Sequence, residues 1–381
     1  MLLIEADGKA LLRAAGIPTP AGVLVSQAEA PPALPGRGPW MVKAQVPVGG
    51  RGKAGGVIRC ETEAAVRVTV QRLLGARIKG HETQCCLVEA AVAGHDEYYL
   101  SLMIDPAQYG VRVTLLREGG VEVEQAANVK DRSRLAVPDE AAIAAAIHEL
   151  TSAESPSRRA ILNDVGDKLA QLFMQRELML AELNPLFVND IGAVAGDAKI
   201  VIDLDAVHRQ PELSNLIERN AAIYPDAIRK LRDGFDYVEI DPEGEIGLVT
   251  TGAGLSMMMI DELTARGGRP MNFCDIRTGL LRGDPTRLVK VLEWIGARPS
   301  VKVMMVGVFA GVTDLSEFAK LFCDALERVP QFKAPIVARL IGVRLAEARV
   351  ILAARRPDIV VEESLDAALA HVDAVLKAAG P

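Results

Sequence analysis

The sequence predicts an α/β protein of two domains, the first built on a mostly antiparallel sheet with flanking helices and the second on a parallel, doubly wound sheet. Three observations lead to this prediction. The chain has 381 residues, which suggests two or three domains at roughly 100–200 residues each. Up to about residue 210, short strand patterns follow one another with few helices between them. From residue 246 onward, strands and helices alternate regularly, as a parallel sheet requires.

The elements expected in the first half follow from apolar spacing and from glycine and proline positions. The first helix is expected over residues 4–15, because Ile4, Leu11 and Leu12 share one side and Gly16 follows. The last strands of this half are expected to flank a turn that contains Asn184-Pro185. Further helices are expected at 62–77, 139–149 and 157–176, and strands at 22–26, 40–46, 57–60, 83–89, 97–104, 110–116, 121–126, 179–183 and 198–203.

The second half shows five strand–helix pairs. Such a sheet binds its ligands at the carboxyl ends of the strands. A polar stretch near 210–243 precedes these pairs, so we expect domains at 1–238 and 239–381. Strands are expected at 246–251, 271–273, 301–309, 336–340 and 359–361, and helices at 254–266, 285–296, 314–328, 344–355 and 364–378.

Composition and charge exclude several classes of protein. The net charge of -7 argues against non-specific nucleic-acid binding, which needs a basic surface. No run approaches the roughly 18 apolar residues of a membrane span, and the first residues lack the pattern of a signal peptide. The five cysteines show neither metal-ligand spacing nor a disulfide framework. We therefore expect a reducing, cytoplasmic compartment.

A glycine-rich segment between two expected strands is the strongest local signal for ligand binding. Lys43 lies in the first of these strands, and Gly49-Gly-Arg-Gly-Lys-Ala-Gly-Gly56 follows with five glycines and two cations. Glycine lets backbone N–H groups approach phosphate oxygens, and Arg51 and Lys53 supply positive charge. Because no Ser or Thr follows the lysine, this is not a P-loop. The alternative is a flexible hairpin whose cations are solvated.

Acidic and amide side chains elsewhere in the first half can complete a nucleotide site. Glu89 and Glu97 lie at or near strand ends, where a carboxylate can accept hydrogen bonds from a ribose or an adenine amino group. Asn184 and Asp197 offer oxygen ligands on adjacent strands, which suits Mg²⁺ bound by one or two protein ligands and by phosphate. The alternatives are solvated surface charges and ordinary Asn-Pro and Gly-Asp turns.

Two glycine-containing segments in the second half lie where a strand is expected to pass into a helix. The first is Thr251-Gly-Ala-Gly-Leu255, and the second is Gly307-Val-Phe-Ala-Gly-Val-Thr-Asp314. The N-terminus of a helix binds anions such as carboxylate or phosphate. The alternative is that these glycines serve packing alone.

In this order, these motifs resemble the beta subunits of succinyl-CoA synthetase, and more broadly the nucleoside-diphosphate-forming acyl-CoA synthetases. The resemblance covers nearly the whole chain. It implies an ATP-grasp domain followed by a flavodoxin-like CoA-ligase domain. Its most specific pieces are the segments that begin at Trp40, Glu97, Glu182, Arg209 and Gly252.

The resemblance also implies roles for individual residues. The nucleotide, ATP or GTP, would lie in the first domain with its magnesium ion, and the acid substrate would meet the second. The implied positions are Lys43, Gly50, Arg51 and Gly52 for the phosphates, Glu89, Val92 and Glu97 for the base and ribose, Asn184 and Asp197 for Mg²⁺, Glu182 as the acid that steadies a phosphohistidine, and Thr251, Gly311, Val312 and Thr313 for the acid substrate.

The family divides its chemistry between two chains. The phosphorylated histidine and most of the CoA site belong to a separate alpha subunit. None of the five histidines of this chain lies in a glycine-rich catalytic loop, as expected for a chain that borrows its nucleophile. The resemblance therefore implies a heterodimer or heterotetramer that makes acyl-CoA, ADP and phosphate, a reaction of the tricarboxylic acid cycle.

The sequence departs from the succinate-type enzymes where the acid substrate is expected. Thr251 replaces an asparagine. Asn272-Phe-Cys-Asp275 is followed by Ile-Arg-Thr-Gly-Leu-Leu-Arg282 where these enzymes have a run of three glycines, and this segment contains Arg277 and Arg282. Arginine binds carboxylates and other anions in a bidentate way. We therefore hypothesise an acid other than succinate, such as malate, another dicarboxylate or a sulfo-carboxylate. The alternative places both arginines on the surface or at a subunit interface.

Two other functions remain compatible with the sequence. A non-catalytic homologue would bind nucleotide for regulation or assembly, although the retained Lys43, Glu182, Asn184 and Asp197 favour catalysis. An ATP-grasp carboxylate–amine ligase would share the first domain, but it would not need the doubly wound second domain.

Overall fold

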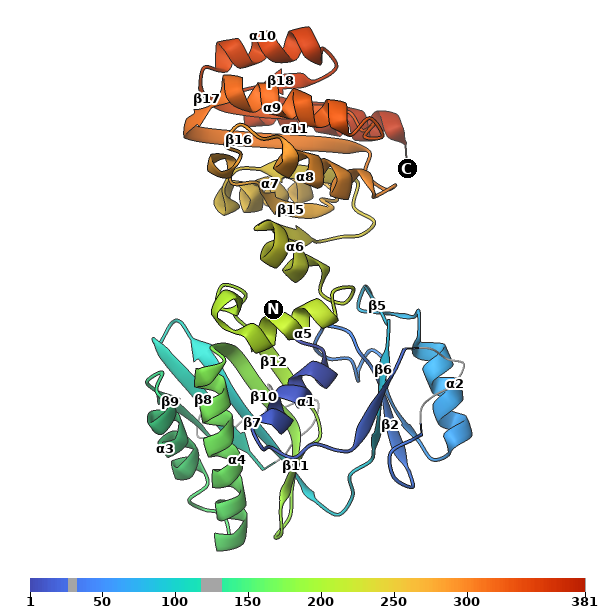
Figure 1. The fold of residues 1–381 in the computed structure, drawn as a ribbon, viewed down its shortest axis with the longest axis vertical. Helices are drawn as coiled ribbons and strands as arrows, with labels where there is room; N and C mark the ends of the chain where they lie inside the picture. Colours follow the sequence, from blue (N-terminus) through green and yellow to red (C-terminus); the bar gives the residue numbers. More distant parts are fainter. Residues whose placement is uncertain (27–32, 118–131, 381) are drawn as a thin grey trace. The chain divides into compact units, whose positions relative to one another are not determined.

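The structure, a computed structural model, describes residues 1–26, 33–117 and 132–380. It divides into two compact units, Met1–Tyr224 and Pro225–Pro381, which we describe one at a time (Figure 1). The boundary expected from the sequence, between 238 and 239, lies further along the chain. The strand expected at 121–126 falls outside the described residues. No helix in the described part combines the length and the apolar character that a bilayer-spanning segment needs.

Two antiparallel sheets form the framework of the first unit, as the sequence predicts. The smaller sheet has the order β1-β6-β2-β3, with bounds Gly22–Val25, Cys86–Ala90, Trp40–Ala44 and Val57–Cys60. The larger has the order β11-β10-β7-β8-β9, with bounds Ala193–Ala195, Leu178–Val188, Asp96–Asp105, Gly110–Leu116 and Ser133–Ala136, and β12 (Lys199–Ile202) also pairs with β10. A short hairpin of β4 (Arg77–Ile78) and β5 (His81–Glu82) follows α2 along the chain.

The helices of the first unit pack on the two sheets. Helix α2 (Glu63–Leu73) packs on the smaller sheet, and α3 (Glu140–Leu150) and α4 (Pro156–Gln175) cover one face of the larger sheet (Figure 1). Their starts follow helix chemistry, because the side chains of Thr62 and Asp139 accept backbone N–H groups and Pro156 opens α4.

Helix α1 (Glu5–Ala14) starts without a side chain of its own as a cap. Instead, the hydroxyl of Tyr224 accepts the backbone N–H of Ile4 at 2.8 Å and donates to the Asp7 carboxylate at 2.7 Å. The side-chain amide of Asn220 also donates to Asp7, at 3.0 Å. The last residues of the first unit therefore hold its first helix in place.

Strand β10 shows that one predicted turn is wrong. The strand continues through Asn184-Pro185, whose peptide bond is cis, instead of ending before it. Because proline has no N–H to donate to a neighbouring strand, the ladder between β10 and β7 shifts its register between Leu183 and Leu186. Asn184 and Pro185 are thus both part of strand β10.

The polar stretch before the second half is also more ordered than the sequence suggested. It contains a 3₁₀ turn, two helices and an edge strand. Their bounds are Val207–Arg209 (η2), Pro211–Arg219 (α5), Pro225–Asp233 (α6) and Asp236–Glu239 (β13).

The second unit is the doubly wound sheet that the strand–helix alternation predicts. Its order is β13-β15-β14-β16-β17-β18, and only the edge strand β13 is antiparallel to its neighbour. The strands β14 to β18 are Ile246–Thr250, Asn272–Asp275, Val303–Asp314, Ile336–Val343 and Val360–Glu362. The helices α7 to α11 are Ala253–Ala265, Thr286–Gly296, Leu315–Arg328, Leu345–Arg355 and Leu365–Ala379, with a 3₁₀ turn (η3) at Thr278–Leu280.

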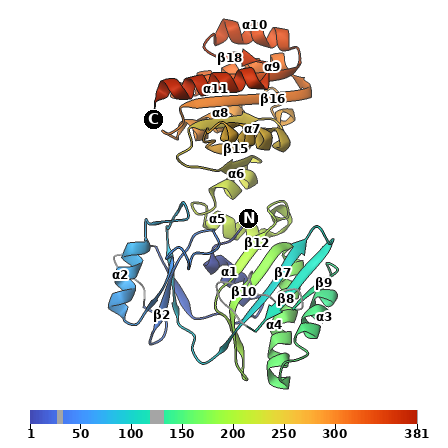
Figure 2. The same cartoon turned by 180° about the vertical axis from the view of Figure 1, so that it is seen from behind.

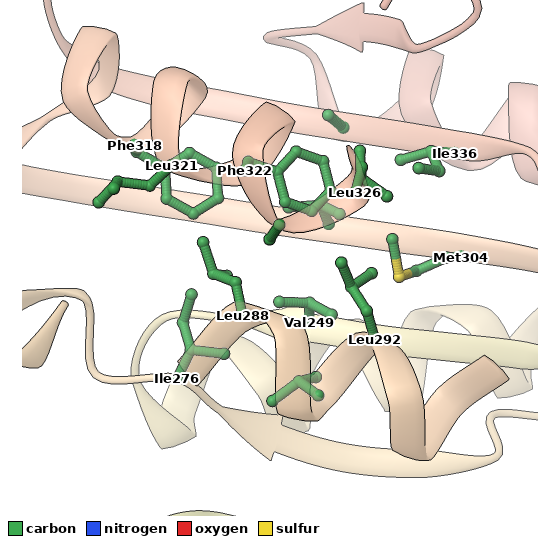
Figure 3. Close-up of a cluster of buried hydrophobic side chains, with 14 of the residues drawn as sticks. Val249, Ile276, Leu288, Leu292, Met304, Phe318, Leu321, Phe322, Leu326 and Ile336 are labelled. Atoms are coloured by element: carbon green, nitrogen blue, oxygen red, sulfur yellow. The ribbon is translucent and has the colours of Figure 1, made fainter. Parts of the chain in front are cut away.

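Two hydrophobic clusters cover the two faces of this sheet. Alternation along β16 sends Met304 into one cluster and Met305 into the other. The larger cluster includes Leu288 of α8 and the stacked rings of Phe318 and Phe322 of α9 (Figure 3). Helices α7 and α11 supply the cluster on the opposite face (Figure 2). Both faces are thus buried, as a parallel sheet requires.

Close packing at Gly247 on β14 gives a test of this arrangement. A Cβ at Gly247 would lie 2.4 Å from Cγ2 of Ile295 on α8. We expect Gly247→Ala to lower the free energy of unfolding of the full chain by about 1–3 kcal/mol, the usual cost of overpacking. Urea denaturation measures this change.

Gly254, in the first turn of α7, provides the matched control. A Cβ there would meet nothing within 4 Å. Gly254→Ala should leave stability unchanged or raise it by up to about 1 kcal/mol, because alanine favours the helix. Equal losses for the two variants would contradict the described packing of α8 on β14.

Candidate active site

A cavity of about 850 Å³ in the first unit is lined by residues from both of its sheets. Strands β2, β3 and β6 contribute from the smaller sheet, and β7, β10 and β12 from the larger. The cavity brings together every residue that the sequence analysis assigned to the nucleotide, the metal ion and the phosphohistidine. These are Lys43, Gly50, Arg51, Gly52, Glu89, Val92, Glu97, Glu182, Asn184 and Asp197.

The glycine-rich segment forms the connection between β2 and β3 at one side of this cavity. Gly50 adopts a φ of 70°, a conformation that side chains disfavour. A Cβ there would also lie 2.8 Å from Nζ of Lys79, whose ammonium donates to the carbonyl of Gly49 at 2.8 Å. Beside Gly52 there is open space. The loop therefore presents backbone to the cavity, as phosphate binding needs.

Lys43 projects from β2 into a group of buried acceptors. Its ammonium donates to Oε1 of Glu5 at 2.6 Å and to the carbonyl of Gly196 at 2.7 Å, and it lies 3.0 Å from Oε2 of Glu89. Burial lowers the pKa of Lys43, but the attraction of Glu5 and Glu89 is larger and raises it above its ordinary value. Lys43 therefore stays charged.

Arg51 is the second buried cation of the site. Its guanidinium donates to Oε2 of Glu5 at 2.8 Å, to Oδ1 of Asp197 at 3.2 Å and to the carbonyl of Ala44 at 3.0 Å. Burial and the nearby charge of Glu5 raise the pKa of Asp197, whereas Arg51 and Lys43 lower it. The pKa of Asp197 ends above its ordinary value.

Glu5 and Lys9 on α1 complete this cluster, and the sequence analysis missed both. Lys9 lies 2.7 Å from Glu5, donates to both carboxylate oxygens of Glu89 at 2.6–2.7 Å, and donates to the carbonyl of Gly196 at 2.9 Å. Burial raises the pKa of Glu5, but Lys43, Lys9 and Arg51 together hold it well below its ordinary value.

A pattern in the sequence could have indicated these two residues. Glu5, Lys9 and Leu12 are spaced so that they share one face of the helix. The prediction of this helix rests on the apolar residues Ile4, Leu11 and Leu12 and does not use Glu5 or Lys9. A glutamate and a lysine one turn apart on an apolar face predict a buried ion pair with further partners.

The two carboxylates expected at the nucleotide differ in exposure. Glu89 borders the cavity, but its carboxylate is buried and paired with Lys9 and Lys43. Glu97, on β7, is exposed and borders the same cavity. Glu97 is therefore the more accessible of the two.

The register of β10 explains why the residues expected at the metal ion share one face. Glu182 pairs with Lys199, Leu186 pairs with Ala195, and the backbone of Gly196 donates to the carbonyl of Pro185. The same register places Asn184 opposite Asp197. Directly opposed side chains lie close together on one face of a sheet, and the Glu182–Lys199 ion pair of 3.3 Å lies on this face too.

This oxygen pair fits the way proteins hold Mg²⁺. No group of three or more His, Cys, Asp or Glu side chains in the described part of the chain could hold a metal ion. Mg²⁺ usually takes one or two protein oxygens, keeps several waters and binds substrate phosphates for the rest. Asn184 and Asp197 supply two oxygens at the cavity wall, beside the phosphate-binding loop.

The residues expected at the acid substrate belong to the second unit. Thr251 and Gly252 follow β14 at its carboxyl end, and Gly252 caps α7 as expected. Gly311 does not precede a helix directly, because β16 continues to Asp314, whose own side chain caps α9. Val312 and Thr313 also lie in β16, and their side chains are outside the described part of the structure.

The two arginines that follow Asp275, Arg277 and Arg282, differ in their surroundings. Both adopt the left-handed conformation, with φ of 48° at Arg277 and 47° at Arg282. The guanidinium of Arg277 is paired with Asp236 of β13. Arg282 is exposed and has no ion-pair partner among the described residues. Arg282 is therefore the cation of the two that is available to an anion.

Comparison with known families agrees with the two units. The family model described as "ATP-grasp domain" matches residues 2–188, and the one described as "CoA-ligase" matches residues 249–372. Both assignments agree with the fold that the sequence predicted for each half.

Curated relatives match along the whole chain. The "Succinate–CoA ligase [ADP-forming] subunit beta" of Ignicoccus hospitalis is 36% identical, with 100% of both chains covered. The corresponding GDP-forming subunit of Thermus thermophilus is 36% identical, with 98% of both chains covered. The ADP-forming subunit of Chloroflexus aurantiacus is 35% identical over 93% of both.

A solved structure shares the fold over nearly the full length. The ATP citrate lyase of Methanothrix soehngenii, solved with citrate and coenzyme A, superposes with a TM-score of 0.70 over 99% of both chains. At 17% sequence identity, this similarity shows the fold alone. The folds of both units of this chain thus have counterparts in a solved structure.

Proposed function

This chain belongs to the family of succinate–CoA ligase beta subunits, and from that premise we propose that its cavity binds Mg-ATP and that the chain makes acyl-CoA together with an alpha subunit. Its class is that of an ADP- or GDP-forming acid–CoA ligase. One observation carries the proposal. A single cavity gathers a glycine loop, two buried cations, an opposed Asn–Asp pair and an exposed glutamate.

The proposed nucleotide position follows from the chemistry of the cavity wall. The phosphates lie against Gly50-Arg51-Gly52 and Lys43, where backbone N–H groups and cations meet negative oxygens. Val92 and Glu97 border the base and the ribose. Asn184 and Asp197 hold Mg²⁺, which, when bound, neutralises part of the phosphate charge.

The nucleophile for the phosphoryl group comes from the proposed alpha subunit. All five histidines of this chain lie in the described part, and none of them lines the cavity. We infer that a histidine of the alpha subunit receives the γ-phosphoryl group while ADP leaves, and that it then passes the group to the carboxylate of the acid. CoA attacks the resulting acyl phosphate and releases phosphate. Glu182, at the cavity wall, steadies the phosphorylated histidine.

The acid substrate is a small anionic acid that meets the second unit. Relatives are named for succinate. This chain has Thr251 where the resemblance expects an asparagine, and a segment with Arg277 and Arg282 where it expects a run of three glycines. Because Arg277 already has Asp236 as its partner, Arg282 is the residue that we propose for an additional negative group of the acid. The substrate-side positions Gly311, Val312 and Thr313 lie on the neighbouring β16.

The five cysteines support a reducing compartment. All five are free and buried. Burial raises the pKa of Cys85 to about 11 and that of Cys86 to about 12, and neighbouring groups add to both shifts. We propose the cytoplasm as the place of the reaction.

Replacing Lys43 tests the nucleotide site. The chain, co-expressed with an alpha subunit from its gene neighbourhood, should release ADP beyond one equivalent per site only when acid, CoA and Mg²⁺ are all present. Lys43→Met should lower kcat/KM for ATP by at least about 100-fold, because a charged hydrogen bond to phosphate is lost in a buried site. EDTA should abolish turnover and excess MgCl₂ should restore it.

Lys320→Met is the control for that variant, since Lys320 is exposed on α9 of the second unit. Its kinetics should match those of the unmodified complex. The nucleotide site is wrongly placed if Lys43→Met turns over ATP normally. A complex that retains nucleotide binding but shows no acid-dependent ADP release points instead to a regulatory role.

Replacing Arg282 tests the acid side. Across a panel of succinate, malate, other dicarboxylates and sulfo-carboxylates, we expect an acid other than succinate to give the highest kcat/KM. Arg282→Gln should raise KM for that acid by about 10- to 100-fold, the effect of losing one charge-assisted hydrogen bond, and should leave KM for ATP nearly unchanged.

Arg277→Gln is the matched comparison, because Arg277 lies in the same connection but is paired with Asp236. It should change KM for the acid by less than Arg282→Gln does. Best turnover with succinate would overturn the hypothesis of a different acid. An unchanged KM in Arg282→Gln would show that another group binds the anion.

A further inference from the structure

Helix α1 carries two charged side chains that touch the phosphate-binding cations. The Glu5 and Lys9 side chains are 0% and 1% exposed, so water reaches neither of them. They lie one helical turn apart, and both contact the charged side chains at the cavity wall. A buried ion pair seldom adds to stability compared with apolar residues of similar shape. The pair therefore calls for another explanation.

The ammonium of Lys43 is already engaged inside the protein. A lysine ammonium has three N–H donors and no acceptor. Lys43 donates to Glu5 at 2.6 Å and to the carbonyl of Gly196 at 2.7 Å, and Oε2 of Glu89 forms an ion pair with it at 3.0 Å. A phosphate oxygen that binds Lys43 therefore competes with these acceptors.

Of the two carboxylates that hold Lys43, Glu5 is bound by both proposed phosphate-binding cations. Its Oε1 lies 2.6 Å from Lys43 and 2.7 Å from Lys9, and its Oε2 accepts from Arg51 at 2.8 Å. A carboxylate that bridges Lys43 and Arg51 offers these cations negative oxygens like those of a phosphate group. When Lys43 turns to another anion, Glu5 still keeps two cationic partners.

Lys9 is the cation that stays beside Glu5 and Glu89 when Lys43 binds another anion. It contacts Glu5 and both oxygens of Glu89, the two acids that share Lys43. A buried carboxylate without a cation is strongly unfavourable. With Lys9 in place, neither acid is left unpaired when Lys43 moves.

We propose that Glu5 is an internal substitute for nucleotide phosphate, which holds Lys43 and Arg51 in position and gives up Lys43 to the phosphate of bound ATP, while Lys9 keeps Glu5 and Glu89 paired. Glu5 and Lys9 are positioning residues, because they act through Lys43 and Arg51. The proposal rests on the proposed function, since it needs the phosphates of ATP beside Lys43.

Opposite effects of two substitutions on nucleotide affinity test this exchange. The probe is Mg-AMPPNP, titrated calorimetrically into the complex of the full chain with its alpha subunit. Glu5→Gln keeps the shape and one acceptor but removes the competing charge, so Kd should fall by about three- to tenfold. Lys9→Met leaves Glu5 and Glu89 more dependent on Lys43, so Kd should rise by about tenfold. A merely structural role would weaken binding in both variants.

The exposed pair Asp164–Lys168 on α4 supplies matched controls with the same spacing and a 2.6 Å contact. Asp164→Asn and Lys168→Met should leave Kd unchanged. Should a single variant at Glu5 or Lys9 not fold, Glu5→Gln/Lys9→Met removes both charges together, and its Kd should lie between that of the unmodified complex and a value about threefold higher.

An unchanged or higher Kd in Glu5→Gln overturns the inference, and so does an unchanged or lower Kd in Lys9→Met. For the double variant, binding weakened by more than about threefold has the same consequence. Failure of the proposed function looks different. In that case the unmodified complex itself does not bind Mg-AMPPNP.

Discussion

The rest of the first unit depends on the mutual pairing of buried charges around Lys43. Carboxylates of Glu5 and Glu89 and the ammonium groups of Lys9 and Lys43 meet without water, at 2.6–3.0 Å. A buried charge that loses its partner costs several kcal/mol, so α1, β2 and β6 can occupy only the arrangement in which every charge is paired. Gly8 reinforces this position, because a Cβ there would lie 3.2 Å from Cβ of Ala198.

The cavity owes its chemistry to this constraint and to the register of β10. The ion cluster fixes two cations beside the glycine loop, and the ladder from Glu182–Lys199 to Leu186–Ala195 turns Asn184 and Asp197 to one face. An anion-binding loop and a pair of oxygen ligands thus meet in one unit. In the second unit, Thr251 and Gly252, which we propose to face the acid, follow β14 at its carboxyl end, where open α/β sheets generally bind ligands.

Local patterns were enough to predict most elements, and long-range pairing explains what they missed. The alternation of strands and helices from residue 246 predicted the doubly wound sheet, and the glycine loop with Lys43 predicted a phosphate site. Glu5 and Lys9 escaped notice because their further partners are distant in the chain: Glu89 is 80 residues from Lys9, and Lys43 and Arg51 are 38 and 46 residues from Glu5. At Asn184-Pro185 the local turn signal was misleading, because pairing with β7 and β11 keeps the segment on the sheet.

A crystal structure of the complex with its alpha subunit, Mg²⁺ and AMPPNP tests the central claim most directly. The account predicts the nucleotide phosphates beside Gly50-Arg51-Gly52, with Lys43 in contact with a phosphate oxygen and the metal ion on Asn184 and Asp197. Glu5 should keep its contacts with Lys9 and Arg51. A nucleotide bound outside this cavity, or phosphates in the cavity with Lys43 still held by Glu5, would contradict the account.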